Sequence, residues 1–284
     1  MDKRRINNYI TLIILLNVLL INSAWGSVNY DEWADIIINA RKHGLRIPLL
    51  SVSYPKANIN TAYRMQRAYV KKRLLYDKIA GLKGALTSKS SQQKYNIKSP
   101  LAGVLLLSGK LTGNSTIYKS QFQKLLVETE IGYKLKSPIK SSLKDISSLK
   151  EHIKSIIPVI EFPDSSFSDM SSIQVIDIIA ANIGADKFIM GEEIPLAELD
   201  PNQEEVSLFL DGKIINQGKG TDTLNDQWAT LLWVINTMLK QGWKLEPNNI
   251  VITGALGKAI PAKAGNYIAD YKNLGKIFFL IEKY

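Results

Sequence analysis

Two glutamates one residue apart lie in the segment Leu126–Tyr133, whose sequence is LVETEIGY. Its alternating pattern predicts a strand, and alternate residues of a strand share a face. Glu128 and Glu130 are therefore expected side by side, where their like charges repel, more strongly if they are buried. A divalent cation between them would remove the repulsion, and oxygen ligands favour Mg²⁺, Mn²⁺ or Ca²⁺. The alternative is a solvated strand face, because two glutamates at this spacing are common.

A third isolated carboxylate, Glu161, ends the apolar run that begins at Ser155. It is either a boundary residue that meets solvent or a third metal ligand from a neighbouring strand. Three carboxylates would leave Mg²⁺ with open positions for waters and a chelating substrate.

Other chemistry is restricted, because the chain has no cysteine and only two histidines, His43 and His152. Thiolate zinc sites, cysteine nucleophiles, disulfides and lipoprotein anchors are excluded, and any metal must be held mainly by oxygen.

Composition places the chain among ordinary globular proteins. It has 284 residues, of which 45% are hydrophobic and 22% charged, and this excludes disorder, collagen-like repeats and coiled coil. The formal net charge is +10, but the lysines are spread along the chain, without a basic helix carrying interleaved aromatic residues. We therefore expect a solvated lysine-rich face and no nucleic-acid partner. The charge is also compatible with an anionic ligand.

The first 26 residues have the pattern of a secretory signal peptide. Basic residues at positions 3–5 precede an apolar stretch, Tyr9–Ile21, and the small residues Ala24 and Gly26 follow. The apolar stretch is shorter than the roughly 20 residues that a membrane-spanning helix needs. We predict cleavage after Gly26, which gives a periplasmic or secreted protein without a stable membrane anchor. The alternative is an uncleaved N-terminal anchor.

Hydrophobic periodicity separates a helical first part from a strand-rich second part. Helices are predicted over residues 32–44, 61–80, 149–157, 173–182 and 225–241. Strands are predicted over residues 104–107, 125–134, 205–210, 213–217, 250–253, 266–270 and 276–281. Asp211 and Gly212 are typical of a two-residue hairpin turn. The predicted class is α+β, with a signal peptide over 1–26, a helical portion over 27–100 and a β-rich body over 101–284 that forms one continuous unit with it.

Several motifs together resemble a known family. They are, in chain order, TAYRMQ at 61–66, GLKGALTSKSSQ at 81–92, PLAGVL at 100–105, the strand with the two glutamates, PVIE at 158–161 and ITGALG at 252–257. These segments resemble the 2-keto-4-pentenoate hydratases. That family also includes 4-oxalocrotonate decarboxylases and belongs to the fumarylacetoacetate hydrolase superfamily. The resemblance covers roughly residues 63–279, and several motifs in order are far more specific than any one of them.

The resemblance implies a fold, a cofactor and a set of site residues. The fold is a β-rich α+β body with a twisted mixed sheet, and family members commonly form homo-oligomers. Mg²⁺ or Mn²⁺ would chelate a 2-oxo acid substrate, and its ligands would be Glu128, Glu130 and Glu161. Lys83 matches the active-site lysine, which would pair with the substrate carboxylate or, with a lowered pKa, move a proton. Thr253 and Gly254 match the substrate side of the site. Without the family, Lys83 is typical of a surface lysine before a turn.

Three positions depart from the family pattern. Leu101 stands where hydratases usually carry an acidic residue, and Ala181 and Gly184 stand in a segment that is usually A-D-N-A-S. These changes leave the metal site intact but remove groups that would orient water. Neither histidine lies in a segment that matches the hydrolase branch, so hydrolysis of a carbon–carbon bond is disfavoured. His152 is expected on a solvated helix face.

Three functional hypotheses follow from these observations. The first is a metal-dependent lyase of the hydratase or decarboxylase type, acting by metal chelation and enolisation on a short unsaturated 2-oxo acid, as in aromatic catabolism. The second is an exported family member that keeps the fold and the metal site but has lost hydratase activity and binds a 2-oxo acid or dicarboxylate. The third is a structural or surface-interaction protein.

Overall fold

The computed structural model describes residues 28–196 and 199–284. The predicted signal peptide and its cleavage site lie outside these residues. Within the described part of the chain, no helix is both long enough and apolar enough to cross a membrane.

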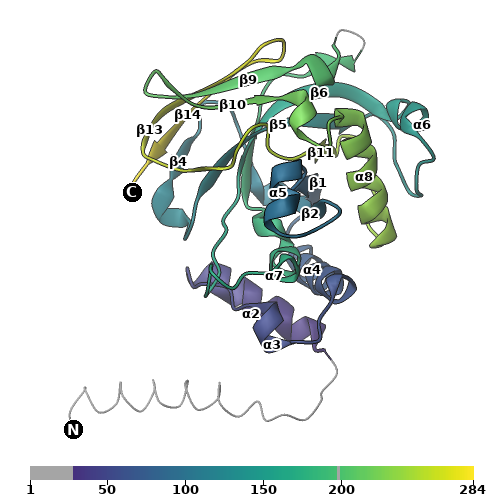
Figure 1. Ribbon diagram of the computed structural model, residues 1–284, viewed down its shortest axis with the longest axis vertical. Coiled ribbons are helices and arrows are strands. Elements are labelled where there is room, and N and C mark those ends of the chain that lie inside the picture. The colour runs from purple at the N-terminus through teal and green to yellow at the C-terminus, as the bar shows by residue number, and fades with distance from the viewer. Residues whose placement is uncertain (1–27, 197–198) are drawn as a thin grey trace.

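The N-terminal portion begins with helices gathered at one end of the molecule (Figure 1). They are α2 (Tyr30–Lys42), α3 (Leu50–Ser53) and α4 (Ile59–Arg73). Asn29 and Asn58 begin α2 and α4 as N-caps, each accepting a hydrogen bond from a backbone N–H three residues later. The predicted helix over 61–80 extends too far. Residues Ile79–Ala85 form a strand, β1, which the sequence analysis did not predict.

A nine-stranded mixed sheet forms the centre of the molecule. Its strands are β1, β2 (Leu101–Leu106), β3 (Lys110–Leu111), β5 (Leu126–Leu135), β6 (Ile153–Phe162), β7 (Lys187–Met190), β8 (Ile194–Pro195), β11 (Ile250–Ile252) and β12 (Ile260–Pro261). The strand order is β2-β1-β11-β5-β6-β7-β3, with β12 paired to β5 and β8 paired to β6. The pairs β1–β11 and β3–β7 are parallel and the others antiparallel.

A second sheet of five strands packs against the first. Its order is β10 (Lys213–Lys219), β9 (Glu205–Leu210), β13 (Gly265–Tyr271), β14 (Gly275–Glu282) and β4 (Thr116–Tyr118). Phe279 of this sheet stacks on Tyr267 and meets Phe162 of the central sheet edge-on, with 5.3 Å between the two phenylalanine ring centroids. The hairpin turn between β9 and β10 is confirmed, because Asp211 and Gly212 both have positive φ.

The helix predicted over residues 149–157 is wrong. Helix α6 (Ile146–Lys150) ends early, and β6 begins at Ile153. Nearly every residue of β6 is buried, so its apolar run has no alternation that would distinguish a strand from a helix. His152 therefore lies in the turn before β6 and not on a helix face, with its Nδ1 2.8 Å from the hydroxyl of Ser137.

The remaining helices are short except for one. They are α5 (Lys89–Lys94), α7 (Val175–Ala180) and α8 (Gln227–Lys240), with 3₁₀ turns at η1 (Leu107–Gly109), η2 (Lys119–Gln121), η3 (Asn182–Gly184), η5 (Pro201–Gln203) and η6 (Gly220–Asp222). Helix α8 lies beside β1 and β11, and α7 packs against α4 (Figure 1). One hydrophobic cluster joins side chains of the helices and of both sheets. The class is α+β, as predicted.

Candidate metal centre

The three glutamates singled out from the sequence lie together on two neighbouring strands. Glu128 on β5 is the direct antiparallel partner of Glu161 on β6, and Glu130 shares the face of Glu128. One carboxylate oxygen from each residue lies within 4.8 Å of those of the other two. Glu130 and Glu161 are fully buried, and Glu128 is half-buried. The interpretation of Glu161 as a solvent-facing boundary residue is therefore wrong.

The cluster has the chemistry of a divalent cation site. Oε1 of Glu130 and Oε2 of Glu161 are buried without a hydrogen-bond partner among the described residues. Burial, followed by the neighbouring carboxylates, raises the pKa of Glu130 well above its ordinary value. Burial also raises the pKa of Glu128 to about 7, with Lys83 opposing the rise. Carboxylate oxygens that lack partners and repel one another are suited to Mg²⁺ or Mn²⁺, so the three residues could hold either ion.

Lys83 lies at the same cluster, on β1. Its side chain is 1% exposed, and its Nζ is 2.5 Å from Oε1 of Glu161. Nζ also donates to the backbone carbonyl of Ile183 at 3.4 Å. Burial alone would lower the pKa of Lys83, but the three carboxylates together raise it above its ordinary value. The expectation of a surface lysine is wrong, and the lysine is held in its protonated form.

A cavity of about 650 Å³ opens onto Lys83 and Glu128. Three further lysines line it, Lys94, Lys124 and Lys258, and they give it a positive charge. Apolar side chains make up much of the remaining wall and include Leu86, Leu126, Met170, Ile178 and Ile183. A small organic anion therefore fits this cavity, with an apolar body against the wall and an acidic group toward the lysines.

Thr253 and Gly254 follow β11 and lie behind the glutamates. The N–H of Gly254 donates to Oε2 of Glu130 at 2.7 Å, so this backbone group holds a candidate metal ligand. The hydroxyl of Thr253 is 2.7 Å from Oε1 of Gln227, and neither Thr253 nor Gly254 is among the cavity-lining residues. Their role in substrate binding stays a prediction. Gly254 has φ +100°, and a Cβ there would collide with Thr87.

Tyr271 also supports the cluster, although the sequence analysis did not select it. Its buried hydroxyl donates to the carbonyl of Val159 at 2.8 Å and accepts from the N–H of Glu130 at 3.1 Å. It therefore ties β13 of the five-stranded sheet to β5 and β6 at the level of the glutamates. An aromatic residue in an alternating strand is typical of a core position, so the sequence carried no signal for this role.

The three positions that depart from the family pattern lie around β2 and the turn η3. Leu101 is buried at the start of β2 and is not among the cavity-lining residues. Ala181 and Gly184 flank Asn182 and Ile183, and Asn182, Ile183 and Gly184 all have positive φ. The side-chain amide of Asn182 exchanges two hydrogen bonds with the backbone of Val104, and these bonds hold the turn against β2.

No protein-family model matches the chain. It is 25% identical over 245 residues to a 2-keto-4-pentenoate hydratase of Paraburkholderia xenovorans, which covers 86% of this chain and 91% of the relative. It is 27% identical over 251 residues to a 2-oxo-hept-4-ene-1,7-dioate hydratase of Escherichia coli, which covers 84% and 92%. A 4-oxalocrotonate decarboxylase of Pseudomonas sp. strain CF600 is 24% identical over 237 residues, covering 83% and 89%. These homologues are hydratases and decarboxylases, which are lyases.

Solved structures show the same fold. The 4-oxalocrotonate decarboxylase of Pseudomonas putida G7, complexed with magnesium and adipate, superposes with a TM-score of 0.85 at 22% identity and covers 90% of this chain and 99% of that chain. A Yersinia pestis CO92 protein assigned to the fumarylacetoacetate hydrolase family superposes with a TM-score of 0.55 at 14% identity, covering 71% and 92%. The predicted fold, N-terminal helices followed by a curled mixed sheet, is confirmed.

Proposed function

Because the chain belongs to the 2-keto-4-pentenoate hydratase and 4-oxalocrotonate decarboxylase family, within the fumarylacetoacetate hydrolase fold, we propose that it is a divalent-metal-dependent lyase. Its substrate would be a short unsaturated 2-oxo acid. The observation that carries the proposal is the cluster of three carboxylates with partnerless oxygens beside a buried lysine, at the inner end of a cationic cavity. The solved 4-oxalocrotonate decarboxylase structure complexed with magnesium and adipate supports both the ion and a small acidic ligand.

Each residue of the site has a distinct role in this proposal. Glu128, Glu130 and Glu161 would hold Mg²⁺ or Mn²⁺, which when bound stabilises the negative charge of an enolate. Lys83 is protonated and buried, so it would pair with the substrate carboxylate or deliver a proton to the carbon chain. The N–H of Gly254 would keep Glu130 oriented toward the ion. The apolar wall would exclude bulk water and strengthen these electrostatic contacts.

Thermal melts of residues 27–284 test the site itself. The melts would be run with EDTA, with Mg²⁺ or Mn²⁺, and with each metal plus oxalate as a mimic of the chelating substrate. We expect the metal to raise the melting temperature and oxalate to raise it further, because ligands that bind only the folded state stabilise it. Glu128→Ala should abolish both effects, whereas the exposed Glu192→Ala should leave them unchanged. Absence of any metal effect on the wild-type protein would contradict the proposal.

Turnover assays then test the reaction. Hydration of 2-oxopent-4-enoate consumes its conjugated dienol tautomer, so the fall in ultraviolet absorbance follows the reaction directly. Decarboxylation of an oxalocrotonate releases carbon dioxide, which can be measured. We expect one of these reactions to depend on Mg²⁺ or Mn²⁺ and to be lost in Lys83→Met. A well-folded, metal-loaded protein without either activity would refute the lyase assignment.

A second candidate function is favoured by Leu101, Ala181 and Gly184. These residues stand where the family usually carries two carboxylates and a hydroxyl, so water addition could be lost while enolisation at the metal survives. Enolisation exchanges the C3 protons of a 2-oxo acid, and proton NMR in deuterium oxide measures that exchange on 2-oxopentanoate. Metal-dependent exchange without hydration would identify this second function, whereas exchange together with hydration would support the first.

We further propose that the protein is exported and acts in the periplasm or outside the cell as a homo-oligomer. The charge and hydropathy pattern of residues 1–26 supports export. Oligomerisation is supported by the resemblance to a family whose members commonly form homo-oligomers. Mass spectrometry of the protein expressed in a Gram-negative host would show an N-terminus at Ser27 if cleavage follows Gly26. Light scattering coupled to gel filtration would give the number of subunits.

A further inference from the structure

A second, smaller hollow of about 330 Å³ lies apart from the metal centre. It is bounded by the end of α2, the end of α4 and the chain that follows β6, and its polar lining includes Arg41, Arg73, Asp164, Ser166 and Asp186. It shares no lining residue with the large cavity. The segment 163–166 separates the two, with Pro163 and Ser165 on the large cavity and the alternate residues on the hollow.

Three polar atoms on the lining residues of this hollow are buried without a hydrogen-bond partner in the described part of the chain. They are Nε of Arg41, Nε of Arg73 and Oγ of Ser166. The guanidinium of Arg41 makes one hydrogen bond, to the carbonyl of Ala181 at 3.3 Å. Buried polar groups of folded proteins are nearly always paired with protein, water or a ligand. Arg41, Arg73 and Ser166 therefore border the hollow with polar atoms that no described residue pairs.

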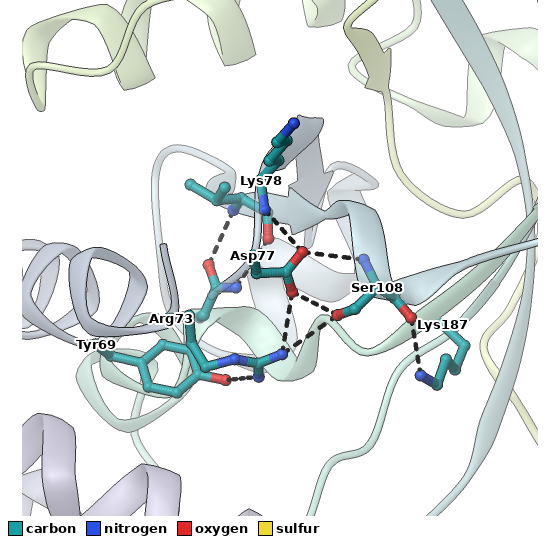
Figure 2. A network of polar contacts seen from close by, with 8 residues as sticks. Tyr69, Arg73, Asp77, Lys78, Ser108 and Lys187 are labelled. Carbon is teal, nitrogen blue, oxygen red and sulfur yellow. Dashed lines mark hydrogen bonds and ion pairs between the residues drawn. The ribbon is translucent and has the colours of Figure 1, made fainter. Parts of the chain in front are cut away.

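Two of the five charged side chains that line the hollow, Arg73 and Asp164, already have close partners. Figure 2 shows the guanidinium of Arg73 held by the hydroxyl of Tyr69 at 3.1 Å and by Asp77 and Ser108 at 3.3 Å each. The carboxylate of Asp164 accepts backbone N–H groups at 3.0 and 2.7 Å. The guanidinium of Arg73 is therefore engaged in an ion pair, and both carboxylate oxygens of Asp164 already accept hydrogen bonds.

Arg41 and Asp186 differ from these pairs. The carboxylate of Asp186 makes no hydrogen bond or ion pair with any residue that the structure describes, although Arg41 lines the same hollow. Burial raises the pKa of Asp186, and Arg41 and Lys187 offset only part of the rise. Arg41 and Asp186 thus line the same small space, and neither forms an ion pair with a described residue; Lys42, an exposed side chain, lines it as well.

We propose that this hollow binds a small zwitterion, a molecule with one carboxylate and one ammonium group such as an α-amino acid. The carboxylate would accept hydrogen bonds from Arg41 and Ser166, and the ammonium group would donate to Asp186. A simple anion would leave Asp186 without a partner, and a simple cation would leave Arg41 without one. The volume equals that of roughly ten water molecules at about 30 Å³ each, which is enough for a small amino acid.

Calorimetric titration and saturation-transfer NMR on the whole protein test the proposal. The probes are glycine, L-alanine and L-serine, with acetate and methylammonium as matched halves at the same ionic strength. We expect at least one amino acid to bind with a Kd of about 1 mM or tighter and each half to bind at least tenfold more weakly. No binding by any of the three amino acids, or equal binding by acetate, would overturn the proposal.

Two variants locate the binding and change its selectivity. Arg41→Gln should weaken amino-acid binding at least tenfold, whereas Arg46→Gln, at an exposed arginine nearby, should leave it unchanged. Asp186→Asn should weaken amino-acid binding and strengthen acetate binding, because it removes the repulsive charge. This gain also distinguishes a bound ligand from a folding defect, which would weaken both. Thermal melts would show whether both variants are folded. If both bind the amino acid as tightly as the wild type, the ligand lies elsewhere and the proposal is contradicted.

Discussion

Substituting Glu128 by glutamine should make the metal-free protein more stable at alkaline pH. In the folded protein the pKa of Glu128 is about 7, against an ordinary value of 4.5, because of burial first and of Glu161 next. The folded state therefore keeps a proton that the unfolded chain has lost, and stability falls as the pH rises from about 4.5 to about 7. Glutamine does not titrate, and its amide N–H can donate to a carboxylate oxygen of Glu161.

The size of the effect follows from the pKa difference. The pKa of Glu128 differs by about 2.5 units between the folded and unfolded states, and the full difference would correspond to about 3.4 kcal/mol of stability lost above pH 7. Glu128 is half-buried at the edge of the cavity, so solvent screens part of its interaction with the other carboxylates. We therefore expect Glu128→Gln to gain about 1–3 kcal/mol at pH 8 and to differ little from wild type at pH 5.

Urea denaturation at both pH values, in EDTA and in saturating Mg²⁺, measures the prediction. In Mg²⁺ the advantage of the variant should shrink or reverse, because at 100 times its Kd a ligand adds about 2.7 kcal/mol to the wild type, and the variant has lost a ligand for the ion. Glu192→Gln, at an exposed position, is the matched control and should follow the wild type throughout. A variant less stable than wild type at pH 8 in EDTA, or one with an undiminished response to Mg²⁺, would refute the reasoning.

Three further substitutions test the supports of the site. Lys83→Met should lower the free energy of unfolding by about 3–5 kcal/mol in EDTA at pH 8, because it leaves Glu161 buried and unpaired. The loss should be smaller in Mg²⁺, and equal losses in the two urea titrations would contradict this reasoning. Gly254→Ala should cost about 1–3 kcal/mol, since it combines a left-handed φ with a clash against Thr87, and a wild-type urea midpoint would argue against that strain. Tyr271→Phe should lower the free energy of unfolding by about 1–3 kcal/mol, because two hydrogen bonds are lost. Hydrogen exchange at the backbone N–H of Glu130 should also speed up. Unchanged exchange would exclude a supporting role of the Tyr271 hydroxyl.

The paired glutamates could be predicted because their signal is local. Side chains two residues apart on a strand share a face whatever the rest of the fold does, so alternation alone placed Glu128 beside Glu130. The position of Glu161 opposite Glu128 depends on the register between β5 and β6, which the sequence does not contain. The alternative of a ligand on a neighbouring strand was therefore open until the structure placed the two residues in register.

Lys83 shows where local reasoning fails. It lies between Gly81 and Gly84, and a lysine flanked by glycines is typical of an exposed turn. Strand β1 exists because β11 and β2 pair with it on either side, and Gly81 is required because a Cβ there would clash with the backbone of Ile250. A lysine is rarely buried in full unless it is paired, and the partner of this one lies far along the chain in Glu161. Only the family motif indicated its role.

The turn η3 changes the meaning of the residues that depart from the family pattern. From the sequence, Ala181 and Gly184 read as lost polar side chains, yet the structure gives their segment a backbone function. Asn182, Ile183 and Gly184 adopt left-handed φ in succession, and such a conformation is strained for a β-branched residue. The strain persists because Asn182 is fixed to β2, and it turns the carbonyl of Ile183 toward the ammonium group of Lys83. The backbone of this segment thus supports Lys83 whether or not its side chains match the family pattern, so proton transfer at the substrate carbon and addition of water are separate steps to assay.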